Sequence, residues 1–119
     1  MSEKRISDME KVLTNLVRED KGTFVIFENP PSEKFVQFAI LEEEMICDIP
    51  LQELSNEEEN RITSFMEIGA TDARTGEPIS YQKSFGKNAT GKAAEFAETL
   101  FLEVFRLPKS YTMETKIGN

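Results

Sequence analysis

Apolar residues in segment 22–50 form three short runs, each of strand length and separated from the next by polar residues. The first run, 23–28, is apolar at both alternating sets of positions, which is typical of a central strand covered on both faces. The second run, 35–41, places its apolar residues mainly on one face, and the third, 45–49, stops at Pro50. Because proline-rich and glutamate-rich turns of only a few residues separate the runs, the segment predicts a three-strand antiparallel meander.

A capping-box pattern marks the start of a predicted first helix. Ser7 stands three residues before Glu10, and serine and glutamate at this spacing can each accept a hydrogen bond from the other's backbone N–H group. The apolar residues that follow recur at helical spacing. We therefore expect a helix that runs to about Asp20 and ends at Gly22.

The middle of the chain predicts a second helix followed by one or two strands. Ser55 and Glu58 repeat the capping-box pattern, and Gly69 can terminate the helix that they begin. Segment 70–78 is polar and indicates a loop, with a short strand near its start as the alternative. Segment 79–85 alternates apolar and polar residues, which predicts a strand with one solvated face near the edge of the sheet.

The last long apolar pattern, from Thr90 to Leu107, covers about half of a helical circumference. A helix with so wide an apolar stripe would be the main cover of the sheet. Leu102 falls outside the stripe and is a candidate for an exposed apolar contact. The polar tail 109–119 is expected to be loose.

These segments predict a single α+β domain over residues 1–119, with an ordered core from about 6 to 108. The expected order is helix, three-strand antiparallel meander, helix, one or two strands, and helix. The helices would pack on the sheet, because each carries one apolar stripe that must be buried.

Charge and composition exclude several classes of function. The chain has 119 residues, 39% of them hydrophobic, and a formal net charge of −8, which repels a phosphate backbone and argues against nucleic-acid binding. A single cysteine, Cys47, excludes an intramolecular disulfide and suits a reducing compartment. With no apolar run long enough to cross a bilayer, the sequence predicts a cytoplasmic protein without membrane contact.

The residue types needed for common catalytic sites are missing. The sequence contains no histidine, which removes the commonest general base and the commonest zinc ligand together. Cys47 lies in the middle of an apolar strand and is expected to be a buried, unreactive thiol. We therefore expect no catalytic residues, no metal site and no cofactor.

One string resembles a phosphate-binding motif. Residues Gly86 to Ala93, GKNATGKA, match the pattern G-x-x-x-x-G-K, but Ala93 stands where a serine or threonine would hold magnesium. The preceding strand is also half polar, whereas the strand before a phosphate-binding loop is buried in a parallel sheet. These departures favour a turn into the last helix, capped by Thr90 or Asn88. The alternative is a small anion- or nucleotide-binding site at the helix N-terminus, formed by Gly86, Gly91 and Lys92.

Several short motifs resemble those of a known group of bacterial proteins. They are Gly22-Thr23-Phe24-Val25, Phe35-Val36-Gln37-Phe38, Cys47-Asp48-Ile49-Pro50 before Leu54-Ser55, Tyr81 to Gly86, and Ala93-Ala94 through Val104-Phe105. In these motifs and in its order of elements, the chain resembles the TY-Chap or YbjN-like group, which has the type III secretion chaperone-like fold. The resemblance implies an α+β sandwich, a homodimer, and a role in binding other proteins rather than in catalysis.

The leading hypothesis is therefore a non-enzymatic protein-protein interaction or chaperone-like module with an unknown protein client. The chain offers more apolar surface than one sheet face needs, and the excess is available to a second copy or a client. The candidate interaction residues are Phe24, Ile26, Phe96 and Leu102.

Overall fold

The computed structural model of the chain describes residues 2–19 and 24–118. Its helical elements are α1 (Glu3–Glu19), η1 (Leu51–Glu53), α2 (Asn56–Ile62), α3 (Thr90–Thr99) and η2 (Leu100–Val104). Its strands are β1 (Phe24–Asn29), β2 (Lys34–Leu41), β3 (Glu44–Pro50), β4 (Glu67–Thr71), β5 (Pro78–Gly86) and β6 (Glu114–Gly118).

The six strands form one antiparallel sheet in the order β4-β5-β3-β2-β1-β6. The predicted meander forms its centre, with Phe38 of β2 between Val25 of β1 and Cys47 of β3. The predicted α+β fold is confirmed. Strand β4 ends at Thr71, so a short strand reaches the start of segment 70–78, which is one of the two alternatives that the sequence left open.

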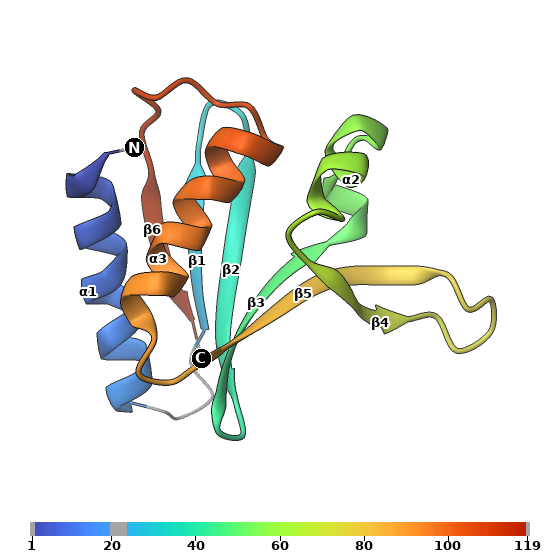
Figure 1. Ribbon diagram of the computed structural model, residues 1–119, viewed down its shortest axis with the longest axis horizontal. Coiled ribbons are helices and arrows are strands. Elements are labelled where there is room, and N and C mark those ends of the chain that lie inside the picture. The colour runs from blue at the N-terminus through green and yellow to red at the C-terminus, as the bar shows by residue number, and fades with distance from the viewer. Residues whose placement is uncertain (1, 20–23, 119) are drawn as a thin grey trace.

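Helices α1 and α3 lie side by side over one face of the sheet, across β6, β1 and β2 (Figure 1). Along each central strand, buried residues that point toward the helices alternate with exposed or half-buried residues on the other face. The buried residues pack with apolar residues of the helices in one core. Fully buried aromatic rings make part of this core, with Phe27 and Phe38 in edge-to-face contact at 6.0 Å between ring centres. Helix α2 lies farther along, beside the β4–β5 end of the sheet (Figure 1).

The predicted cover on both faces of β1 is wrong for the described residues. Val25, Phe27 and Asn29 are buried under the helix layer, whereas Phe24 and Ile26 on the other face are only half-buried. In residues 2–19 and 24–118 the helices lie on one face of the sheet, so they leave the second apolar set of β1 uncovered.

Two of the predicted helix starts need correction. Helix α1 begins at Glu3, before the predicted capping box at Ser7, and the Ser2 hydroxyl accepts the backbone N–H of Arg5 at 3.2 Å. Helix α3 follows Ala89, which makes no side-chain cap, so neither Thr90 nor Asn88 caps it. The box at Ser55 and Glu58 is confirmed, since both reciprocal hydrogen bonds are present. Gly22, predicted to end the first helix, lies outside the described residues.

The ends of two other elements also differ from prediction. Helix α2 ends at Ile62, and Gly69 lies inside β4, where the side chain of Gln82 fills the space that a Cβ would need. The last helix continues past Thr99 as the wider turn η2, with Phe105 N–H donating to the Leu100 carbonyl at 3.0 Å. The predicted helix to Leu107 thus ends earlier, at Val104.

The C-terminal tail carries strand β6, which the polar sequence did not predict. This strand pairs with β1 from Phe24–Gly118 to Glu28–Glu114. Backbone pairing places it there, since residues 114–117 are all exposed. Among the described helices, none has the length and apolar character needed to cross a membrane.

Candidate protein-interaction surface

The sheet face turned away from α1 and α3 is the candidate surface, and we call it the open face. Strand register assigns it the residues that alternate with the buried core residues. Its central members are half-buried, in contrast to their fully buried neighbours on the helix side. Its apolar residues on β1, β2 and β3 include Phe24, Ile26, Phe35, Ala39, Ile46 and, at the exposed end of β2, Leu41.

One row of cross-strand neighbours makes the open face apolar over several strands. Phe24 pairs with Gly118 of β6 on one side and with Ala39 of β2 on the other. Ala39 in turn pairs with Ile46 of β3, and directly paired residues lie close enough for side-chain contact. The row therefore presents continuous apolar surface from β6 to β3.

Polar residues around this row are bonded to one another. Gln82 donates to the Asp48 carboxylate at 2.8 Å, and Ser84 donates to Glu44 at 3.0 Å. On the opposite side, the Lys116 ammonium lies 2.7 Å from the Glu28 carboxylate, which raises the pKa of Lys116. A partner covering the apolar row would therefore leave these polar groups with bonding partners, which lowers the cost of desolvating them.

The four predicted interaction residues fall on two separate surfaces. Phe24 and Ile26 lie on the open face, whereas Phe96 and Leu102 lie in the helix layer and are partly buried against the core. Phe96 meets Phe85 edge to face at 5.4 Å between ring centres. The structure therefore does not bring the four residues together.

The predicted anion-binding residues do lie together, since Gly86, Gly91 and Lys92 line one shallow surface hollow at the start of α3. The Glu10 carboxylate of α1 approaches Gly91 so closely that a Cβ at this glycine would lie 3.2 Å from an oxygen. Negative charge at this position opposes a bound anion. Anion binding at this loop stays a prediction.

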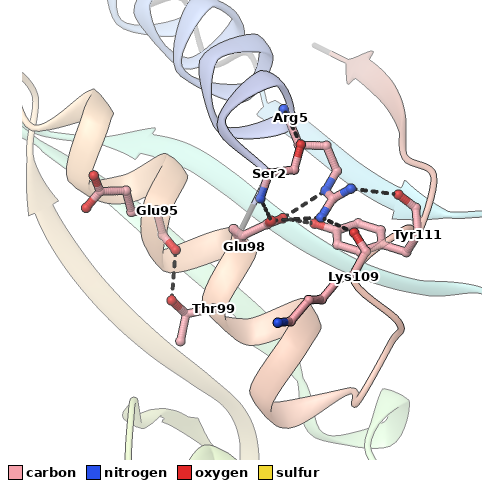
Figure 2. Close-up of polar contacts among 7 residues, drawn as sticks. All are labelled: Ser2, Arg5, Glu95, Glu98, Thr99, Lys109 and Tyr111. Carbon is pink, nitrogen blue, oxygen red and sulfur yellow. Dashed lines mark hydrogen bonds and ion pairs between the residues drawn. The ribbon is translucent and has the colours of Figure 1, made fainter.

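A buried charge cluster that the sequence did not predict joins both ends of the chain (Figure 2). The fully buried Glu98 carboxylate of α3 accepts two hydrogen bonds from the Arg5 guanidinium, at 2.9 and 2.8 Å. It also accepts the Tyr111 hydroxyl at 2.5 Å and the backbone N–H of Ser2 at 2.9 Å. Arg5 lies 3.8 Å from the centre of the Tyr111 ring and donates to the carbonyls of Tyr111 and Lys109.

The electrostatics of this cluster follow from burial and pairing. Burial alone would raise the pKa of Glu98, but the hydrogen bonds from Arg5, Tyr111 and Ser2 outweigh it and hold that pKa below its ordinary value. Burial, reinforced by the bond to Glu98, raises the pKa of the Tyr111 hydroxyl. Because Ser2 and Arg5 lie 96 and 93 positions from Glu98, no local pattern could reveal the cluster. The mutual hydrogen bonding of its members indicates a structural role.

Cys47 and the acidic side chains are the remaining candidates for a nucleophile or a metal site. Cys47 is fully buried, and this burial, with Asp48 adding to it, raises the pKa of its thiol well above the ordinary value. No group of three or more acidic or cysteine side chains among residues 2–19 and 24–118 is arranged to hold a metal ion.

Comparisons of the chain with protein-family models, with curated proteins and with solved structures find no match. The resemblance to the secretion chaperone-like group therefore stays a prediction. The finding is an α+β fold with a six-strand antiparallel sheet and three α-helices in the described part of the chain.

Proposed function

We propose that this chain is a non-enzymatic protein-binding module, chaperone-like, that forms a homodimer through its open face. The observation that carries the proposal is the apolar row of Phe24, Ala39 and Ile46, on a sheet whose helices, in the described part of the chain, cover the opposite face. Apolar surface of this extent, surrounded by paired polar groups, is typical of a site that meets another protein.

The dimensions of the chain support a partner of protein size. Its principal extents are 39 × 34 × 22 Å, and the shortest is the direction across the helix and sheet layers (Figure 1). The broad face has room for the roughly 800 Å² that each partner buries in a stable complex. Two copies with open faces together would form a sheet-on-sheet core about 10 Å thick, between two outer helix layers.

Light scattering coupled to size-exclusion chromatography tests the dimer. The wild-type chain is expected at twice its 13.6 kDa mass. Ile46→Thr keeps a β-branched side chain but removes apolar surface from the centre of the row, so it should shift the dimer toward monomer. Ile79→Thr is the matched control, because Ile79 is half exposed on β5 but lies outside the open face, and this variant should stay dimeric.

A monomeric wild type at high micromolar concentration contradicts the homodimer. The chaperone-like role has a separate test, in which the chain is added to insulin whose disulfides are being reduced. We expect the wild type to delay the rise in light scattering of the aggregating B chain, and Ile46→Thr to delay it less. Equal delays by both proteins, or no delay by either, contradict client binding through the open face.

A further inference from the structure

Strand β6 is held almost without buried side chains. Its residues 114–117 are exposed, Ile117 by 64%, and it adds no member to the core. The neighbouring strand β1, in contrast, carries apolar residues on both of its faces. Backbone pairing is therefore the main attachment of β6, so little side-chain burial opposes its separation from the sheet.

The chain immediately before β6 is firmly fixed. Tyr111 is buried in the charge cluster and packs on Phe101 at 4.9 Å between ring centres. The Asn29 amide donates to the Thr112 carbonyl at 2.6 Å. Met113 also packs, partly buried, against the core, so this anchor reaches the residue before β6. Because β6 itself contributes no core residue, it can leave β1 without disturbing the core.

Two side-chain features select the segment that fits beside β1. Gly118 lies under the Phe24 ring, and a Cβ at this position would overlap that ring. Two residues earlier and on the same face, Lys116 forms its 2.7 Å ion pair with Glu28. The edge of β1 thus favours a basic residue followed, two positions later, by a glycine.

We propose that the outer edge of β1 is a strand-docking site for an extended segment of a partner protein, and that β6 occupies this site as an internal substitute. The partner segment would run antiparallel to β1 and carry lysine or arginine two residues before glycine. Main-chain hydrogen bonds would supply affinity, and contacts with Phe24 and Glu28 would supply selectivity. This site uses the main-chain edge of β1, whereas the dimer proposed above uses the side chains of the open face; the two share Phe24.

Tethering gives β6 an advantage over any free segment. A strand joined to its site by a short linker acts as if present at about millimolar concentration. A free peptide of the same sequence should therefore bind the wild-type chain only at comparable concentrations. Substitutions that weaken the pairing of β6 with β1 should allow the free peptide to bind at micromolar concentration.

The test uses a fluorescein-labelled peptide of residues 112–118, TMETKIG, and full-length chains, with binding followed by fluorescence anisotropy. Lys116→Glu with Gly118→Val places a repelling charge beside Glu28 and a side chain against Phe24. This variant should bind the peptide at least about tenfold more tightly than the wild type. Gly86→Val is the matched control, since a Cβ there meets no atom within 4 Å, and it should bind like the wild type.

Substituted peptides test selectivity without altering the protein. A peptide with valine at the Gly118 position should bind the double variant at least about tenfold less tightly. A peptide with glutamate at the Lys116 position should also bind less tightly. Equal binding of all three peptides, or no gain in binding by the double variant, overturns the proposal.

Amide hydrogen exchange provides an independent measurement. Backbone amides of β1 that face β6 should exchange faster in the double variant than in the wild type or Gly86→Val. Unchanged protection of these amides also overturns the proposal. Circular dichroism checks that the double variant is folded. If it is not folded, the wild-type chain is titrated instead with each of the three peptides at millimolar concentration. The proposal then requires that only the unsubstituted peptide changes the hydrogen exchange of the β1 amides.

Discussion

Substitution of Glu98 by glutamine should destabilise the chain more than any conservative surface change. Glutamine has the same shape as glutamate, but it carries no charge and presents an NH₂ group. The Arg5 guanidinium, whose side chain is only 15% exposed, would lose its counter-ion. The new NH₂ would also meet N–H donors from Arg5 or Ser2, which now point at the carboxylate.

The expected cost is about 3 kcal/mol of unfolding free energy at pH 7. Removal of one partner of a buried ion pair typically costs about 3–5 kcal/mol. We place the variant at the lower end, because Arg5 keeps its bonds to the backbone carbonyls of Lys109 and Tyr111. A chain of this length should have a total stability of roughly 6–18 kcal/mol, so the variant should still fold.

Urea unfolding at several pH values measures the effect. The pKa of Glu98 is lowered in the folded state, so its contribution is complete above its ordinary pKa of 4.5 and is lost as the pH falls below that value. The difference between wild type and Glu98→Gln should therefore be constant near neutral pH and shrink in acid. Lys4→Met, which breaks an exposed pair with Asp8, is the control and should change stability by less than about 0.5 kcal/mol. A Glu98→Gln effect as small as that of the control at pH 7 would refute the reasoning.

Three further predictions concern the helix cap, the core and the thiol. Ser55→Ala removes the hydroxyl that accepts the Glu58 N–H and should lower the unfolding free energy by about 1 kcal/mol in urea; an unchanged midpoint contradicts a capping role. Phe38→Ala deletes a fully buried ring and should cost about 3–5 kcal/mol in the same assay, whereas Leu41→Ala, at a side chain that is 65% exposed, should cost less than about 0.5 kcal/mol. Cys47 should react with a thiol reagent only after unfolding, because it is fully buried and its pKa is raised; rapid reaction of the native chain would show that the strand opens locally.

Elements with a local signal were predictable from the sequence. The meander depends on short apolar runs separated by a proline-rich and a glutamate-rich turn, and α2 depends on the box at Ser55. Each of these elements follows from residues that lie near one another in the sequence. The first helix was found but misplaced, because the same box pattern occurs by chance at Ser7 inside the helix. The hydroxyl of Ser2 acts as the cap without a glutamate at the matching position, and Arg5 stands there instead.

Elements without a local signal were missed for a physical reason. Strand β6 is exposed at every residue from 114 to 117, so burial imposes no alternation on its sequence. The charge cluster forms only when Arg5, Glu98 and Tyr111 meet through the fold. The open face was only partly predicted: the two apolar sets of β1 were visible, but which set the helices leave uncovered depends on the packing of the whole chain.

The charge cluster and β6 together explain how so polar a strand stays on the sheet. Four exposed residues and a half-buried glycine bury too little surface to offset the conformational entropy lost when the strand is ordered. The anchor at Tyr111 and Thr112 fixes the start of the segment, so that β6 has only a short loop to close before it pairs with β1. The stabilising contacts therefore lie just before β6, whereas β6 itself is attached to β1 weakly. Weak attachment is what the proposed exchange of β6 for a partner segment requires.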